Sequence, residues 1–321
     1  MTLYLCQAGY EAFLIKEVGG KIERTGPGWV LGPQARGEPC FSHLALNEPV
    51  EAEGSSVNAL SGALADYFTG STKDERFEGP WPYCVESSSE AGLARRAKTV
   101  ADECLERIRG RMSRVAKLAV SGRPALGPSR GLFVYLPTFD RAFVGREATA
   151  GGQRRMADDP QAPSRSYLKV EEAYGIFGRE PLEGETVADL GAAPGGWSYS
   201  AARRGALVIA VDNGPLKGGA LHSGITHKAE DAFKFAPERP VDWLFCDMVE
   251  DPDRIIDLLD VWLKSGWCKR FVVNLKFSRQ DPLRLLERCE SLRPRCALLR
   301  ARHLFHDREE LTLVGERRPG P

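Results

Sequence analysis

The second half of this chain predicts an α/β fold, with a mostly parallel sheet and helices on both faces. Strand and helix patterns alternate from residue 167 onward, and a glycine-rich turn, DLGAAPGGWS at 189–198, joins the first strand to a helix. Such alternation is typical of a parallel sheet covered by crossover helices. The last two apolar runs, 296–302 and 310–315, are too close for a helical crossover, so these strands are expected to be antiparallel.

The elements of this half follow from hydrophobic periodicity and from turn residues. The first helix is expected over SYLKVEEAYGIF, residues 166–177. The expected strands are 186–191, 206–212, 241–247, 270–276, 296–302 and 310–315, with one further, poorly defined strand before Asp231. The expected helices between them are 196–204, 229–234, 253–264 and 281–291.

The first half has weaker patterns and is expected to be α+β. Residues 1–50 mix short apolar runs with Gly and Pro, which indicates a small unit with a hairpin. The elements expected after it are helices over 57–68 and 92–119 and strands over 131–139 and 141–145. The chain should therefore divide into four segments: 1–52, 53–146, a polar linker rich in Gly and Pro at 147–165, and 166–321.

The formal net charge of zero hides a local asymmetry. Residues 1–90 carry thirteen acids and six bases, whereas residues 95–130 carry ten bases and three acids. Such a basic block is either a nucleic-acid footprint or an ordinary solvated helix face, and composition alone leaves both open. The candidate phosphate contacts are Arg95, Arg96, Arg107, Arg111 and Arg114. Three linker arginines that could guide a target strand are Arg154, Arg155 and Arg165.

The eight cysteines predict no metal site. None forms a CxxC pair or has a His at zinc-ligand spacing, and several lie in apolar runs where cysteine acts as a small buried hydrophobe. Reduced thiols in a cytoplasmic protein are the simplest interpretation. The first residues lack the basic region of a signal peptide, and no apolar run reaches the roughly 18 residues needed to span a bilayer, so no membrane partner is expected.

The glycine-rich turn is a poor cradle for a phosphate. A dinucleotide fingerprint reads G-x-G-x-x-G, but its second glycine is replaced here by Ala193 or Pro194, and no G-K-[ST] follows as a Walker turn requires. Pro194 also removes one N–H donor. These features favour a ligand without phosphate, and S-adenosylmethionine fits. The candidate loop residues are Gly191, Ala193, Pro194, Gly195 and Gly196.

Acidic residues follow successive strands and suit the same ligand. Asp189 ends the first strand, where it can face an ammonium group, and Asp212 ends the second, where a carboxylate can accept both ribose hydroxyls. Asp231 follows the third strand and is the candidate for the adenine amino group.

Four further charged residues interrupt apolar patterns and are expected at one edge of the sheet. Asp247 and Lys276 end strands, and Glu310 opens a strand that starts at the same edge because it is antiparallel. Lys169 can reach this edge if the first helix packs beside the first strand. Such a cluster suits proton removal from a weakly acidic ribose 2′-hydroxyl, which needs a base and nearby cations. Salt-bridged pairs at strand ends are the alternative.

Six motifs carry a resemblance to a known family. SRSYLKVEEAY, DLGAAPGGWS, VDNGP, CDMVE, NLKF and REELTL, within residues 160–315, resemble the FtsJ/RrmJ-type ribose 2′-O-methyltransferases. The resemblance implies a class I S-adenosylmethionine-dependent, Rossmann-like fold: a mostly parallel seven-stranded sheet with an antiparallel last strand. It also implies a Lys-Asp-Lys-Glu tetrad of Lys169, Asp247, Lys276 and Glu310, with Lys276 as proton acceptor. Glu309 is the alternative to Glu310.

The resemblance extends to ligands and to the first half. The cofactor contacts that it implies are Ser166, the run from Ala193 to Gly196, Asp212, Asp231 and Asp247. The implied substrate is a cytidine in the peptidyl-transferase region of 23S rRNA, as naked or partly assembled RNA, and a cytoplasmic monomer is expected. The basic helix and the strands after it look like a THUMP domain, preceded by a small ferredoxin-like unit.

Three other functions remain open from the residues alone. Another RNA could be the substrate of the same reaction. An NAD-dependent oxidoreductase is a different class, against which the absent middle glycine argues. A non-catalytic RNA-binding protein is the third, and the four charged residues at one edge argue against it.

Overall fold

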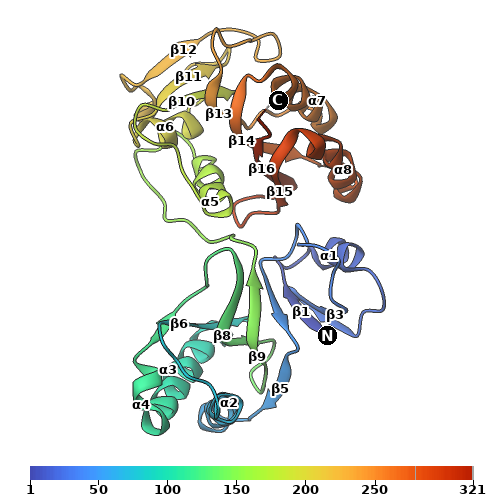
Figure 1. The fold of residues 1–321 in the computed structure, drawn as a ribbon, viewed down its shortest axis with the longest axis vertical. Coiled ribbons are helices and arrows are strands. Elements are labelled where there is room, and N and C mark those ends of the chain that lie inside the picture. The colour runs from blue at the N-terminus through green and yellow to red at the C-terminus, as the bar shows by residue number, and fades with distance from the viewer. Residues whose placement is uncertain (279, 320–321) are drawn as a thin grey trace. The chain divides into compact units, whose positions relative to one another are not determined.

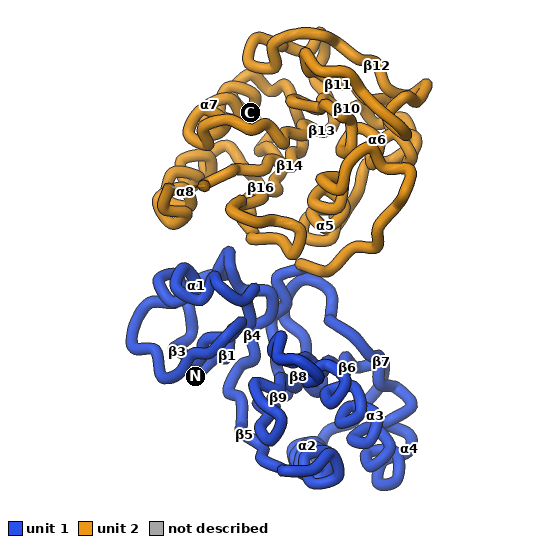
Figure 2. The backbone as a smooth tube through the Cα atoms, turned by 180° about the vertical axis from the view of Figure 1, so that it is seen from behind, with its two compact units in different colours: residues 1–152 blue, residues 153–321 orange. Residues whose placement is uncertain are grey.

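The computed structural model describes residues 1–278 and 280–319, and the chain forms two compact units, 1–152 and 153–321 (Figure 2). Within the part of the chain that it describes, no helix is long and apolar enough to cross a membrane. Each unit is built on its own sheet (Figure 1).

Unit 1 has one continuous sheet in the order β2-β3-β1-β4-β9-β8-β6-β7, with β5 also paired to β9. Its strands are β1 (Thr2–Leu5), β2 (Arg24–Gly26), β3 (Trp29–Gly32), β4 (Leu44–Asn47), β5 (Val50–Glu53), β6 (Trp81–Ser87), β7 (Ala119–Ser121), β8 (Gly127–Leu136) and β9 (Arg141–Ala150). Because β4 pairs with β9, with Leu44 opposite Ala150, the sheet crosses the expected boundary between residues 52 and 53. Residues 147–150 belong to β9, so the expected start of the linker at 147 is wrong.

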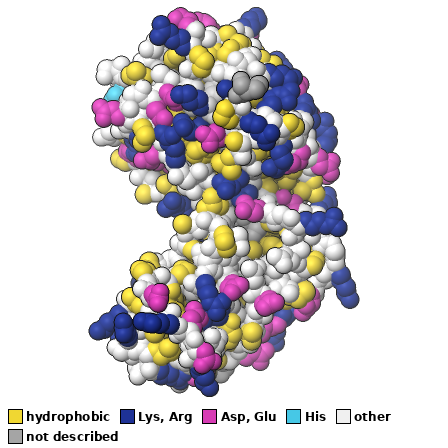
Figure 3. Space-filling model, viewed as in Figure 1, with side chains coloured by type: hydrophobic (Ala, Val, Ile, Leu, Met, Phe, Trp, Pro, Cys, Tyr) yellow, Lys and Arg dark blue, Asp and Glu magenta, His cyan; other side chains and the backbone are white. Residues whose placement is uncertain are grey.

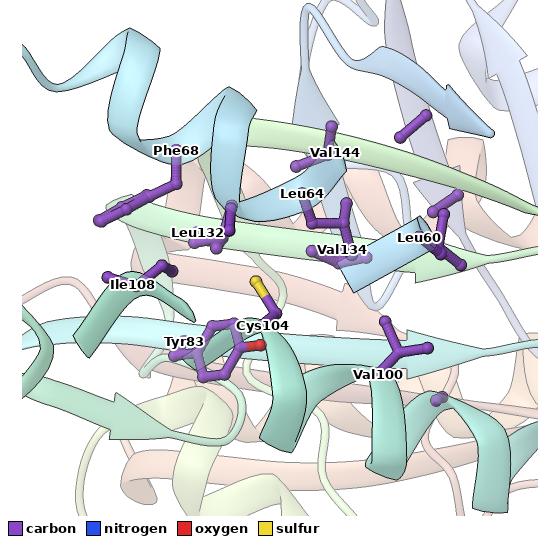
Figure 4. Packing of buried hydrophobic residues seen from close by; sticks show 14 of the residues in the cluster. Leu60, Leu64, Phe68, Tyr83, Val100, Cys104, Ile108, Leu132, Val134 and Val144 are labelled. Atoms are coloured by element: carbon purple, nitrogen blue, oxygen red, sulfur yellow. The ribbon is translucent and has the colours of Figure 1, made fainter. Parts of the chain in front are cut away.

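Two long helices cover part of this sheet. The helices of unit 1 are α1 (Glu11–Val18), α2 (Val57–Ser71), α3 (Leu93–Arg111) and α4 (Ser113–Ala116). Apolar residues spaced four apart on α2 and α3 pack against one another and against β6, β8 and β9 (Figure 4). These residues are Leu60, Leu64 and Phe68 on α2 and Val100, Cys104 and Ile108 on α3. The single helix expected over 92–119 is wrong beyond Arg111, because Met112 leaves the helical region at φ −139° and ψ 60°.

Unit 2 has the seven-stranded sheet that the sequence predicts. The order is β12-β11-β10-β13-β14-β16-β15, and every neighbouring pair is parallel except those of β16. The strands are β10 (Thr186–Leu190), β11 (Leu207–Val211), β12 (Ile225–Lys228), β13 (Val241–Cys246), β14 (Cys268–Lys276), β15 (Cys296–Arg302) and β16 (Glu310–Arg317). The order reverses at β10, whose neighbours are β11 and β13, and ligands of open α/β sheets bind at such a switch point.

Helices lie on both faces of this sheet, with α5 and α6 on one side and α7 and α8 on the other (Figure 1). They are α5 (Tyr167–Phe177), α6 (Gly196–Ala202), α7 (Pro252–Ser265) and α8 (Pro282–Cys289), with 3-10 turns η1 (Gly218–Ala220) and η2 (Glu290–Arg295). The helix expected over 229–234 is wrong: the segment after β12 is a turn, in which the Phe233 amide donates to the Asp231 carboxylate. All eight cysteines are buried free thiols, and burial raises the pKa of Cys246 to about 12.

The segment before α5 has no helix or strand but is fastened to unit 2. Tyr199 on α6 donates its hydroxyl to Asp159 at 2.8 Å, and the Gly219 amide donates to the Gln161 carbonyl at 3.2 Å. A buried carboxyl group, that of Glu172 on α5, accepts the backbone amides of Arg154 at 3.1 Å and Phe305 at 3.0 Å. Glu172 therefore ties the linker to the loop between β15 and β16.

Glu172 predicts a specific pH dependence of stability. Burial raises its pKa in the folded protein to about 8, against about 4.3 for an unfolded chain. Its contribution to stability is therefore fully present below about pH 4 and is lost as the pH rises to about 8, at up to about 1.4 kcal/mol per pH unit. We expect the free energy of unfolding of Glu172→Gln minus that of wild type, measured by urea unfolding between pH 5 and 8, to increase with pH at about this rate. The exposed neighbour variant Glu309→Gln should show no such trend; equal pH trends for Glu172→Gln and wild type would refute the role of Glu172.

Candidate active site

The candidate site lies where the parallel strands of unit 2 end. Asp247 directly follows β13, and Lys276 is the last residue of β14. Because β16 runs antiparallel to β14, its first residue, Glu310, lies directly opposite Lys276 in the strand register. The predicted meeting of these side chains at one sheet edge is therefore confirmed as a matter of geometry.

The two lysines and two carboxylates form one contiguous cluster. Lys276 Nζ lies 2.5 Å from Asp247 Oδ1 and 3.8 Å from Glu310 Oε1. Lys169 Nζ, from the first turn of α5, lies 3.4 Å from the same Asp247 oxygen and 2.5 Å from Glu310 Oε2. Each lysine thus contacts both carboxylates. Glu309 is exposed and contributes its carbonyl to the Phe277 amide, so Glu310 is the glutamate that meets the lysines.

The electrostatics of Lys169 favour its charged form. Burial by itself would lower the pKa of this lysine, but the charges of Asp247 and Glu310 outweigh burial, and the pKa is raised. Lys169 is therefore an ammonium at neutral pH. A fixed positive charge inside the cluster can stabilise an anion that develops beside it.

Ser166 connects the cluster to the helix of the glycine turn. Its hydroxyl donates to Asp247 Oδ2, while its carbonyl accepts the indole N–H of Trp197 at 2.9 Å. Asp247 therefore uses one carboxylate oxygen for the lysines and the other for Ser166. The predicted cofactor residue Ser166 is placed beside the catalytic candidates by this bond.

The glycine turn after β10 leaves no room for side chains at two of its positions. Gly191 has φ +74°, and a Cβ on it would come within 2.3 Å of the Met248 side chain. Gly195 has φ +106°, and its Cβ would come within 2.3 Å of Ala220. Both backbone conformation and space therefore require glycine here. Ala193, Pro194 and Gly196 lie in the same turn.

Asp212 follows β11 and faces this turn. Its carboxylate accepts the Ala193 amide at 3.0 Å and the Gly214 amide at 2.7 Å, so both oxygens are oriented by backbone donors. Free lone pairs on such a carboxylate can accept hydroxyl groups of a ligand. Asp231 lies in the turn after β12 as a half-exposed carboxylate, 3.5 Å from Lys234 Nζ.

Asp189 faces the interior. Its side chain is 1% exposed, and its Oδ2 accepts the Ser198 hydroxyl at 2.6 Å. Burial raises the pKa of Asp189 to about 7. In this position the carboxyl group of Asp189 holds α6 beside the turn through Ser198. The expected contact of Asp189 with the ammonium group of a ligand stays a prediction.

Three polar residues outside the predicted set surround the base of the cluster. They are Asn274, Asp307 and Thr312, all buried. Asn274 Oδ1 accepts from Lys276 Nζ at 3.2 Å. The available signal was an asparagine two residues before Lys276 in the otherwise apolar run FVVNLK.

Several of the candidate phosphate-binding arginines of unit 1 make contacts within the unit itself. Arg111 pairs with Asp66 at 2.5 Å, Arg107 donates to Ser61, and Arg96 donates to the carbonyl of Ser55. The side chains of Arg95 and Arg114 are exposed. Figure 3 shows basic side chains projecting from the region of α3 and α4, interspersed with acidic ones.

The linker arginines also have contacts. Arg165 pairs with Asp158 at 2.6 Å, and Arg155 lies over the ring of Phe305. A role for these arginines toward a target strand stays a prediction.

Several known proteins resemble this chain over all or part of its length. Residues 162–273 match the FtsJ-like methyltransferase family. Ribosomal RNA large subunit methyltransferase M of Chromohalobacter salexigens is 34% identical over 354 residues, with 97% of this chain and 96% of the relative covered. The protein of that name from Halorhodospira halophila is 35% identical, with 83% and 76% covered. Among solved structures, a possible methylase from Clostridium difficile 630 aligns over 100% of this chain and 98% of its own, at 12% identity and a TM-score of 0.38.

Proposed function

This chain belongs to the ribosomal RNA large subunit methyltransferase M family, and we propose that it methylates the ribose 2′-oxygen of a cytidine in the peptidyl-transferase region of 23S rRNA. The substrate would be naked or partly assembled RNA in the bacterial cytoplasm. The observation that carries the proposal is the cluster of Lys169, Asp247, Lys276 and Glu310 at the edge of the methyltransferase sheet.

The residues of the turn fit S-adenosylmethionine, the methyl donor of this class of enzyme. Asp212 offers oriented carboxylate oxygens to ribose hydroxyls, and Asp231 offers an acceptor for the adenine amino group. The first turn of α6 carries no basic residue, which suits a donor without phosphate. When bound, the donor supplies an electrophilic methyl carbon on a sulfonium sulfur, which keeps the electron pair of the broken bond.

The tetrad supplies proton removal and charge. Lys276 Nζ, in its amine form, takes the proton of the 2′-hydroxyl as the 2′-oxygen forms its bond to the methyl carbon. Lys169 stays an ammonium beside the developing negative charge on the 2′-oxygen. Asp247 and Glu310 hold both lysines at this edge, and Lys276 later releases its extra proton to water.

Mapping of methyl groups tests the proposal. The purified protein would be incubated with methyl-labelled S-adenosylmethionine and with 23S rRNA from cells lacking the gene, assembled large subunits, or tRNA. A 2′-O-methyl group protects the following phosphodiester bond from alkali, so protection of one cytidine in naked 23S rRNA is expected. Label on a base, which leaves the bond sensitive, would refute 2′-O transfer. Protection of tRNA alone would favour the alternative substrate.

RNA binding by unit 1 gives a separate prediction. The logarithm of RNA affinity falls as the logarithm of the salt concentration rises. For single-stranded RNA, each arginine that contacts a phosphate makes this slope steeper by about 0.7. The double variant Arg95→Gln/Arg114→Gln should therefore lower this slope by about 1.4 in filter-binding titrations. A matched pair, Arg284→Gln/Arg293→Gln, removes exposed arginines that pair with Asp253 and Glu290 in unit 2. Equal slopes for both pairs would mean that the basic face of α3 and α4 is ordinary surface.

A further inference from the structure

A buried polar network lies directly beneath Lys276. Asn274, on β14, is 0% exposed in an otherwise apolar strand. Its Nδ2 donates to Asp307 Oδ1 and to Thr312 Oγ1, both at 3.0 Å. Thr312 in turn donates its hydroxyl proton to Asp307, and burial raises the pKa of Asp307 to about 7. While Asp307 is ionised, both partners of Asn274 need a donor, which fixes the orientation of the amide. The amide oxygen therefore points to Lys276 Nζ, at 3.2 Å.

Asp307 anchors this network from the loop between β15 and β16. Its side chain is 4% exposed, and Oδ2 accepts the Leu304 amide at 3.0 Å and the Thr312 hydroxyl at 3.1 Å. A buried polar group without partners is costly, so the network is held as a unit. None of its three residues, Asn274, Asp307 and Thr312, belongs to the proposed tetrad.

A lysine that serves as a base needs such an anchor. Its four-carbon side chain has several rotatable bonds, and an ammonium offers three N–H donors. The acceptors around Lys276 Nζ are Asp247 Oδ1 at 2.5 Å, the Asp247 carbonyl at 3.4 Å and Asn274 Oδ1. An amide oxygen accepts a hydrogen bond from either protonation state of the lysine. A carboxylate in its place would bind the ammonium form much more strongly.

We propose that Asn274 is a positioning residue for Lys276 and that hydrogen bonds to Asp307 and Thr312 hold its amide in place. Because this amide is neutral, it leaves the lysine able to exchange its proton. This inference rests on the proposed function, because it gives Lys276 the part of the base. The buried network thereby links the β15–β16 loop to the protonation equilibrium at the sheet edge.

Two variants test the inference, and both are measured first in the protein alone. Asn274→Asp places a third carboxylate near Lys276 Nζ, beside those of Asp247 and Glu310, and should raise the pH at which Lys276 titrates by about one unit or more. NMR of the lysine Cε and Nζ, with the Lys276 signals assigned by their loss in Lys276→Arg, reports this directly. The acidic limb of kcat against pH should shift by the same amount, while calorimetry should give an S-adenosylhomocysteine affinity within about twofold of wild type.

Thr312→Val keeps the shape of the side chain but removes the hydroxyl that both Asn274 and Asp307 contact. It should lower kcat by about tenfold and alter the Lys276 titration, and Thr312→Ser should restore both. Thr186→Val is the matched control. It removes a hydroxyl that donates to Asp242 at 3.0 Å, at the first residue of β10 and so at the opposite end of the sheet, and should alter stability only.

The outcomes separate this inference from the proposed function. If Asn274→Asp and Thr312→Val match Thr186→Val, with lower stability but an unchanged Lys276 titration, the network is structural and the inference is wrong. If Asn274→Asp fails to fold, Thr312→Val decides. If wild type methylates no RNA while the Lys276 titration shifts as expected, the proposed function fails and the coupling of Asn274 to Lys276 stands.

Discussion

Replacing Lys276 by alanine is expected to lower the rate of methyl transfer to RNA by about 10³-fold, as is usual when a general base is removed. The lysine is the only one of the four tetrad residues that both ends a parallel strand and carries a basic side chain. Its Nζ contacts Asp247 rather than the residues of the glycine turn. The affinity for S-adenosylhomocysteine, measured by calorimetry, should therefore change by less than about threefold.

Lys269→Ala is the matched control for this variant. Lys269 lies on the same strand, where it pairs with Asp242 at 2.8 Å and is mostly exposed. Its loss should leave methyl transfer within about twofold of wild type, because exposed ion pairs contribute little. Methylation by Lys276→Ala at a rate close to that of Lys269→Ala would show that Lys276 is not the base.

The candidate site could be predicted because strand direction alone determines where its residues meet. Asp247 and Lys276 end parallel strands, and the short loop before Glu310 forces the last strand to start at the same edge. No side-chain packing had to be known for these three. Lys169 needed one further condition, which was expected to be the packing of α5 beside β10. In the structure α5 packs mainly against α6 and β16, and its first turn brings Lys169 to Glu310 at the start of β16.

The parts that could not be predicted depend on contacts between distant residues. The sheet of unit 1 is continuous because Leu44 pairs with Ala150, a contact that no local pattern shows. From the sequence alone Asn274 looks like a tolerated polar residue in an apolar strand, because its partners Asp307 and Thr312 lie 33 and 38 residues later in the chain. The hydrogen bond from the Ser198 hydroxyl on α6 to Asp189 on β10 is likewise a contact between separate elements that the strand pattern does not show.

Asp212→Ala should have the largest effect on cofactor binding. The Asp212 carboxylate is held by the amides of Ala193 and Gly214, so it is oriented before any ligand arrives. Hydrogen bonds to a charged group contribute about 1.5–3 kcal/mol each, and two ribose hydroxyls would lose them together. The variant also leaves the two amides without their acceptor. We expect the Kd for S-adenosylhomocysteine to rise by about 100-fold or more in calorimetry.

The effect of Asp212→Ala on cofactor binding is best compared with that of Asp231→Ala. Asp231 is half-exposed in a turn and offers one acceptor to adenine, so its loss should weaken binding by only about tenfold. NAD should not bind wild type measurably, since the turn lacks the middle glycine of a pyrophosphate cradle. Equal effects of the two substitutions would mean that Asp212 orders the glycine turn without contacting the ribose. Tight binding of NAD would instead contradict the interpretation of the turn as a poor phosphate cradle, and the cofactor assignment would then rest on membership of the methyltransferase family rather than on the turn.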